Sequence, residues 1–140
     1  MGTRRKSREL TMQMLFQGDL GKQTPEEVGA LFWRSRDDVD AETRGFAEDL
    51  HRVAAARQPE IDALIEEHAQ NWRLERLAVV DRNLLRAAVA EMLGYPNTPA
   101  AIIINESLES ARRYAAPESV QFLNGVLDAI ARDLLKQRLG

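Results

Sequence analysis

Residues 118–135, ESVQFLNGVLDAIARDLL, form the stretch that decides the fold. Its apolar residues recur at intervals of three and four, which places them on one face of an amphipathic helix. Pro117 suits a first helical position, and Glu118 beside it favours the positive end of the helix dipole. The face that we expect in the core consists of Leu123, Val126, Leu127, Ile130 and Leu134.

Asn124 and Gly125 interrupt this helix at its centre, where Gly costs about 0.5–1 kcal/mol relative to Ala. A glycine at the centre of a predicted helix indicates one of two things. Either a partner's backbone or ribose approaches closely there, or two helices pack tightly. Phe122 precedes Leu123 and lies about 100° from the apolar face. It is therefore a candidate for stacking on an RNA base, or else it packs in a second part of the core.

The rest of the chain is also helical in its spacing. Thr24 followed by Pro25 and Glu27 predicts a capping box, Asp40 predicts a second N-cap, and Gly94 suits the position just after a helix. The spacing also places His68 and Trp72 on one apolar stripe. Further helices are expected over about residues 10–20, 25–33, 41–58, 59–72, 77–93 and 99–115. With no strand alternation and no repeat, residues 1–140 are predicted to form one all-α domain of about seven helices.

Composition excludes several classes of protein. The 140 residues contain no apolar run of about 18 residues, so we expect no membrane span. They contain no Cys and no secretory signal, so we expect a cytoplasmic protein. The two histidines, His51 and His68, lack the spacing of zinc ligands to each other. There is no glycine-rich phosphate loop and no hydrolase motif. We therefore expect no enzyme, no cofactor and no metal.

Positive charge is concentrated at the N-terminus. The chain has a net charge of −3, yet Arg4, Arg5, Lys6 and Arg8 face only Glu9 within the first 18 residues. Cations at the start of a helix oppose its dipole, and a bound anion would offset this. Residues 1–8 are therefore predicted to be a basic arm that binds the phosphates of a polyanionic partner. A frayed, solubilising tail is the alternative.

A second pair of cations lies one turn apart on one predicted helix. Arg82 and Arg86 are either a second basic site for phosphates or part of a solvated helix face.

Three segments together resemble the NusB family of transcription antitermination factors. They are RRKSRELTMQMLFQGDL at 4–20, VDRNLLRAAVAEML at 80–93 and AIIINESLESARRYAAPESVQFLNGVLDAIAR at 101–132. The most specific parts are INES at 104–107 and FLNGVLD at 122–128. The resemblance covers nearly the whole chain and is weakest over residues 22–70.

The resemblance implies two small helical bundles without catalytic activity. It implies that the protein binds single-stranded boxA RNA of ribosomal RNA leaders together with ribosomal protein NusE, and so acts on RNA polymerase alongside other Nus factors. By this analogy Arg4, Arg5, Lys6 and Arg8 contact RNA, with Arg86, Phe122, Asn124 and Gly125 as weaker candidates. The implied NusE surface consists of Phe16, Leu20, Asp81 and Glu118.

The chain departs from the family in places. Gly18 stands where many relatives carry a large aromatic residue, and Phe16 lacks the hydroxyl of the Tyr often found there. Other functions compatible with the residues are a protein–protein adaptor that does not bind RNA and a helical DNA-binding module. The NusB-like domain that precedes some RNA cytosine methyltransferases is a further alternative. Whether the protein is a monomer or a homodimer stays open.

Overall fold

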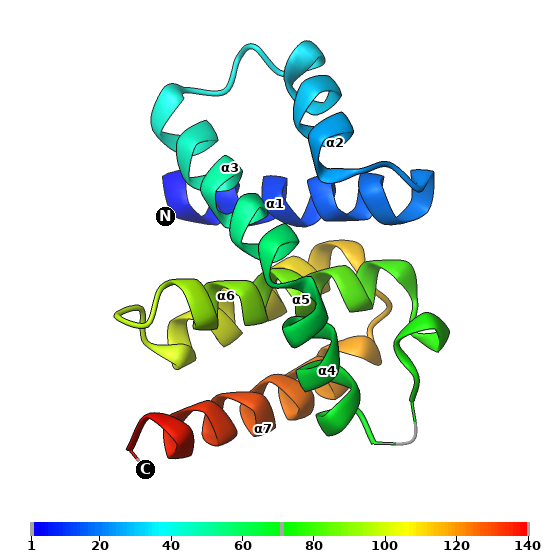
Figure 1. Cartoon of the computed structure of the whole chain (residues 1–140), viewed down its shortest axis with the longest axis vertical. Coiled ribbons are helices and arrows are strands. Elements are labelled where there is room, and N and C mark those ends of the chain that lie inside the picture. Colours follow the sequence, from blue (N-terminus) through cyan, green and yellow to red (C-terminus); the bar gives the residue numbers. More distant parts are fainter. Residues whose placement is uncertain (1, 71, 140) are drawn as a thin grey trace.

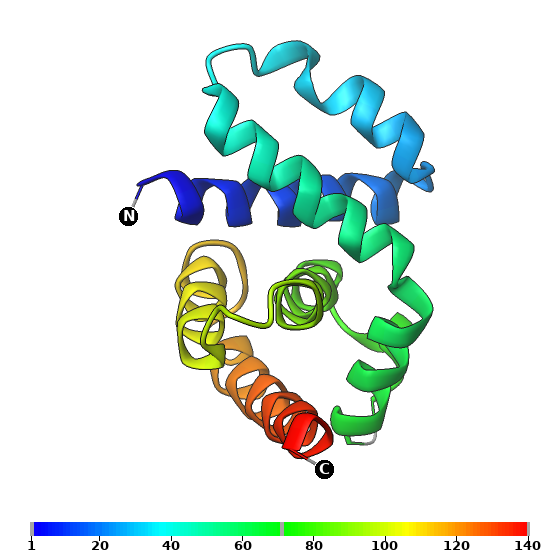
Figure 2. The same cartoon turned by 60° about the vertical axis from the view of Figure 1, so that its left-hand side comes forward.

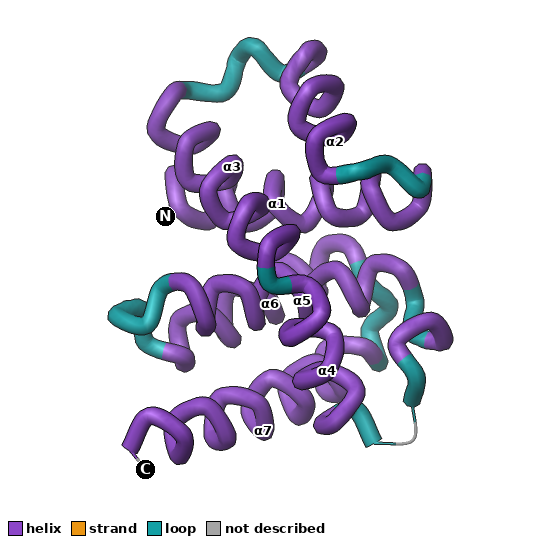
Figure 3. Tube along the Cα trace, viewed as in Figure 1, coloured by secondary structure: helices purple, strands orange, loops and turns teal. Residues whose placement is uncertain are grey.

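The computed structural model of the chain describes residues 2–70 and 72–139, and this part contains helices and loops but no strand (Figures 1 and 3). The all-α prediction is therefore confirmed. Seven α-helices are joined by short loops and two 3₁₀ turns. Their bounds are α1 Gly2–Gly21, α2 Pro25–Phe32, η1 Trp33–Ser35, α3 Ala41–Ala56, α4 Gln58–His68, η2 Leu74–Arg76, α5 Val79–Gly94, α6 Ala100–Tyr114 and α7 Ser119–Leu139.

Helices α1, α2 and α3 form the smaller of two bundles, in the upper part of Figure 1. The predicted caps start two of them: Thr24 and Glu27 form a capping box at α2, and the Asp40 carboxylate accepts a hydrogen bond from the Thr43 amide at α3. The core of this bundle consists of Leu10, Met14, Val28, Phe32, Trp33 and Ala47.

Helices α4 to α7 form the larger bundle around α5. Figure 2 views α5 nearly end-on, with α1, α4, α6 and α7 arranged around it. The predicted apolar face of α7 is buried throughout, with Leu123, Leu127 and Ile130 fully inaccessible to solvent. The periodicity of residues 118–135 therefore identified the core correctly.

Two local predictions were wrong. Helix α4 ends at His68, so Trp72 lies beyond its apolar stripe and its surface is 51% exposed. Gly94 is the last residue of α5 and does not adopt a positive φ. Its small size matters instead, because a Cβ there would lie 2.9 Å from a methyl group of Val53 in α3.

Candidate nucleic-acid and partner interface

The N-terminal cations belong to α1 and do not form a separate tail. Because α1 begins at Gly2, all four are held on a helix that packs against α3, α5 and α6. Arg4 and Lys6 are exposed, and the Arg4 guanidinium lies 3.7 Å from the centroid of the Phe46 ring. That stacking fixes the direction of one cation without neutralising its charge.

Arg5 and Arg8 point towards neighbouring helices and make bidentate ion pairs. Arg5 donates from Nε and Nη2 to the Glu106 carboxylate in α6, at 2.9 Å each. Arg8 donates in the same way to Glu91 in α5, at 2.8 and 2.7 Å. The hydrogen bonds from Arg5 hold the pKa of Glu106 below its ordinary value, and those to Glu91 raise the pKa of Arg8.

These ion pairs divide the predicted RNA-binding arm into two parts. The Arg8 side chain is 15% exposed and its partner Glu91 is 2% exposed, so Arg8 mainly fastens α1 to α5. Arg5 is 39% exposed and keeps one side open to solvent. The positive surface open to solvent therefore consists of Arg4, Lys6 and part of Arg5. It offers fewer cations to RNA than the four that a flexible tail would expose.

The second predicted basic site is an internal network. Arg82 donates to both oxygens of Asp19 at 2.6 and 2.8 Å. Arg86 pairs with Asp62 at 2.9 Å and with Asp19 at 3.1 Å, and its side chain is 14% exposed. The interpretation of these arginines as a solvated face is wrong, because Arg82 binds α5 to α1 and Arg86 binds α5 to both α1 and α4. A phosphate contact by Arg86 stays a prediction.

The three RNA-contact candidates on α7, Phe122, Asn124 and Gly125, differ in their exposure to solvent. Phe122 is half-buried against the larger core and lines a pocket with Trp72 and Leu77. Asn124 and Gly125 are exposed, and no neighbouring atom lies within 4 Å of where a Gly125 Cβ would be. Tight packing between helices is therefore excluded as the reason for this glycine, whereas the approach of an external partner stays a prediction.

The four residues of the predicted NusE surface differ greatly in exposure. Leu20, near the end of α1, is 63% exposed, whereas Phe16 is half-buried against the larger core. Asp81 is only 8% exposed, and its carboxylate accepts a hydrogen bond from the Ser119 hydroxyl at 2.8 Å. Burial raises the pKa of Asp81. Glu118 is exposed and lines the same pocket as Asp81.

Sequence reasoning missed the acidic partners of the cations. Glu91 and Glu106 lie 83 and 101 residues from the arginines that they bind. No local pattern joins residues so far apart. The resemblance had singled out the INES segment at 104–107. The structure shows that its glutamate, Glu106, binds Arg5 and so joins α6 to α1.

No helix among the residues that the structure describes is long and apolar enough to span a membrane. The fold and the surface together define a class: a small helical protein of two bundles that presents exposed cations on the first turns of α1.

The comparisons with known proteins identify the family within this class. The NusB family matches residues 5–132. The transcription antitermination protein NusB of Koribacter versatilis is 60% identical over 137 residues, which cover 98% of this chain and 94% of the relative. The protein of the same name from Sorangium cellulosum is 42% identical, with 96% and 95% covered. The chain belongs to the NusB family.

Solved structures agree with this assignment. The T. maritima NusB structure superposes with a TM-score of 0.83 at 32% identity, covering 92% of this chain and 90% of that one. A crystal structure of antitermination factors NusB and NusE in complex with dsRNA superposes with a TM-score of 0.86 at 27% identity, covering 95% and 98%. The expectation of two small helical bundles of the NusB type is thereby confirmed.

Proposed function

We propose that this protein is a transcription antitermination factor that binds RNA jointly with ribosomal protein NusE. Its curated relatives carry the antitermination name, and a structural neighbour contains NusB and NusE together with RNA. We further propose that the RNA is the boxA element of ribosomal RNA leaders, and that the complex acts on RNA polymerase with other Nus factors. The antitermination name of the relatives argues against the methyltransferase alternative.

The observation that carries the RNA proposal is the exposure of Arg4 and Lys6 at the start of α1. Positive side chains there are unfavourable, because they lie next to the positive end of the helix dipole. Bound phosphate groups would compensate the charge of the side chains and that of the helix end. The Arg5 side chain, which is partly open, is a third phosphate contact. Arg8 acts indirectly, because it holds the helix in place through Glu91.

An acidic and apolar surface supports the NusE proposal. Glu118 is exposed just before α7, and it lines one pocket together with Trp72 and Phe122. A ribosomal protein is expected to be basic, so an exposed carboxylate beside apolar side chains suits it. Leu20 on α1 is a further exposed apolar contact.

The first experiment is a titration of labelled boxA RNA with the protein, with and without NusE, over a series of salt concentrations. Each single-stranded phosphate contact contributes about 0.7 to the slope of log K against log salt, so Arg4→Ala/Lys6→Ala should reduce the magnitude of the slope by about 1.4. Lys136→Ala, which removes an exposed cation near the end of α7, is the control and should leave the slope unchanged. An unchanged slope in the double variant would refute the RNA surface.

Competitors in the same titration test the finer proposals. We expect boxA RNA to compete better than scrambled RNA of the same length, and NusE to tighten binding of boxA. Because a neighbouring complex contains dsRNA, duplex RNA and duplex DNA are included as competitors. Preference for either duplex over single-stranded boxA would contradict the boxA proposal.

A protein–protein adaptor is a second candidate function, and one observation favours it. The guanidinium groups of Arg5 and Arg8 already bind carboxylates within the chain, which leaves fewer cations for RNA. Glu118→Lys should weaken capture of NusE while RNA binding by the protein alone survives. If NusE binds tightly but no RNA binds under any condition, the adaptor function is correct.

A further inference from the structure

His68 ends α4 in a position where one of its ring nitrogens is available to a ligand. Its Nδ1 lies 2.9 Å from the Leu64 carbonyl oxygen, and its side chain is 15% exposed. A carbonyl oxygen only accepts hydrogen bonds, so Nδ1 carries the proton and the neutral ring has its lone pair on Nε2. Metal-binding histidines are held in this way, with the second ring nitrogen bonded to a backbone carbonyl.

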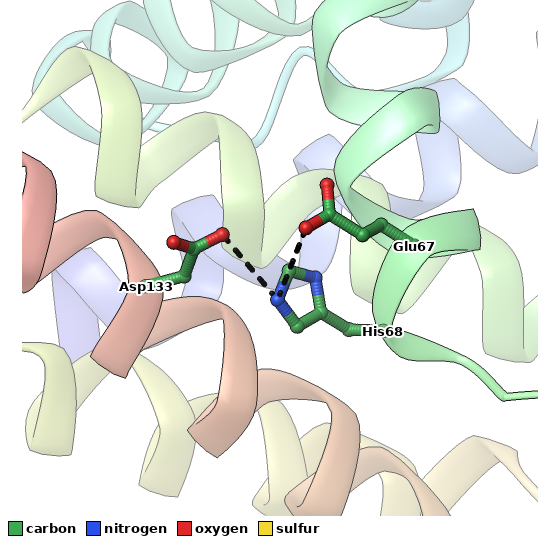
Figure 4. A group of neighbouring side chains, drawn as sticks. All are labelled: Glu67, His68 and Asp133. Carbon is green, nitrogen blue, oxygen red and sulfur yellow. Dashed lines mark ion pairs between the residues drawn. The ribbon is translucent and has the colours of Figure 1, made fainter.

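Two carboxylates face this lone pair (Figure 4). Asp133 on α7 places Oδ2 at 3.4 Å from Nε2, and Glu67 on α4 places Oε2 at 4.0 Å. All three potential ligand atoms lie within 4.8 Å of one another. Gln137 donates a hydrogen bond to the other Asp133 oxygen, which leaves Oδ2 facing the histidine.

The distance between His68 Nε2 and the Asp133 oxygen fits a shared cation better than a direct hydrogen bond. Ligands about 2.0–2.2 Å from a tetrahedral zinc ion lie roughly 3.3 Å from one another, close to the separation of Nε2 and the Asp133 oxygen. A charge-assisted hydrogen bond from a protonated ring would be about 2.7–2.9 Å long. Glu67 is 64% exposed, so its side chain is free to complete the site.

The negative charge around His68 lacks a basic partner among the residues that the structure describes. Glu91, Glu106 and Asp19, which also join helices, each pair with an arginine. Within residues 2–70 and 72–139, neither Glu67 nor Asp133 forms an ion pair with a lysine or arginine. The carboxyl-terminal end of α4 adds partial negative charge at the same place. A cation from solution would balance this charge.

We propose that Glu67, His68 and Asp133 bind one divalent transition-metal ion, with zinc as the best-fitting metal. One imidazole nitrogen and two carboxylate oxygens are ligands that zinc accepts, and water would complete the coordination. The ion ties the end of α4 to α7, just before the segment that contains Trp72. Chain spacing alone excluded a metal site because the third ligand comes from another helix.

The test is calorimetric titration of the full chain with zinc, with magnesium as a comparison. We expect one equivalent of zinc to bind, and His68→Gln and Asp133→Asn each to weaken its affinity by more than about tenfold. Asp128→Asn is the matched control, because it removes a carboxylate of α7 that pairs with Arg132 instead. Magnesium, which demands octahedral oxygen ligands, should not bind measurably.

Thermal unfolding and NMR supply independent measurements. With zinc about a hundredfold above its Kd, the Tm should rise by roughly 5–10 °C in the wild type and in Asp128→Asn, but not in Asp133→Asn. Zinc should shift the ring signals of His68 and leave those of His51, which serves as an internal control. The proposal is overturned if zinc does not bind at about 1 mM, or if binding survives both ligand substitutions. It is also overturned if only a proton, and no metal, stabilises this group.

Discussion

The ion pair between Arg8 and Glu91 permits a sharp test of how α1 is held. Glu91 is 2% exposed, so Arg8→Met would leave its carboxylate buried without a partner. Removing one member of a buried pair costs about 3–5 kcal/mol, because the remaining charge is not solvated. For a chain of this length, that loss corresponds to a decrease in Tm of roughly 10–20 °C.

The double variant Arg8→Met/Glu91→Leu should regain most of the lost stability. The surroundings of this pair include Met12, Leu50 and Leu84, so an apolar pair suits them. We expect its free energy of unfolding to return to within about 1 kcal/mol of the wild type. Lys6→Met, which replaces an exposed cation of the same helix, is the control and should change stability by less than about 0.5 kcal/mol.

Urea denaturation of the wild type, Arg8→Met, Glu91→Leu and Arg8→Met/Glu91→Leu, followed by circular dichroism, gives the double-mutant cycle. The reasoning fails if Arg8→Met costs less than about 1 kcal/mol, or if the double variant is no more stable than Arg8→Met alone. Either result would mean that Glu91 reaches solvent or another partner once Arg8 is removed. RNA binding measured on Arg8→Met should therefore be interpreted only after its stability is known.

Four other substitutions have effects of definite sign. Leu127→Ala should destabilise by about 2–5 kcal/mol, because the side chain is fully buried, and a urea midpoint near that of the wild type would contradict this. Gly94→Ala should destabilise the protein, because the new Cβ would lie 2.9 Å from a methyl group of Val53. Gly45→Ala should stabilise it by about 0.5–1 kcal/mol, because there is open space around this position within α3. Equal changes in Tm for the two variants would refute this contrast. Arg5 lowers the pKa of Glu106 from 4.5, so the stability that this carboxylate contributes is present above pH 4.5 and is lost as the pH falls through its folded pKa. Glu106→Gln should therefore lose stability less steeply between about pH 6 and pH 3, and an unchanged urea-midpoint profile would argue against the pair.

Local signals in the sequence predicted the helices well. The spacing of Leu123, Leu127 and Ile130 identified the buried face of α7, and Thr24 and Asp40 identified two helix starts. These predictions succeeded because periodicity and capping depend on residues within about one turn of each other.

Predictions that depend on tertiary contacts succeeded less well. Arg86 carries a charge that sequence alone assigns to the surface, but two carboxylates from other helices surround it. Trp72 continues the spacing of α4 although the helix has already ended. Gly94 fits a common helix-ending signal, whereas its real constraint is a neighbour in α3. Each error arises where a distant segment decides the environment of a residue.

Helix α1 of the smaller bundle contributes side chains to both cores, and this has a consequence for cooperativity. Leu10 and Met14 belong to the smaller core, whereas Met12, between them in sequence, belongs to the larger core. Neither core is complete without this helix. If α1 detaches when one bundle unfolds, the core of the other bundle is exposed to solvent as well. The two halves should therefore unfold in a single transition, and a ligand bound at the first turns of α1 should protect amides of both bundles from hydrogen exchange.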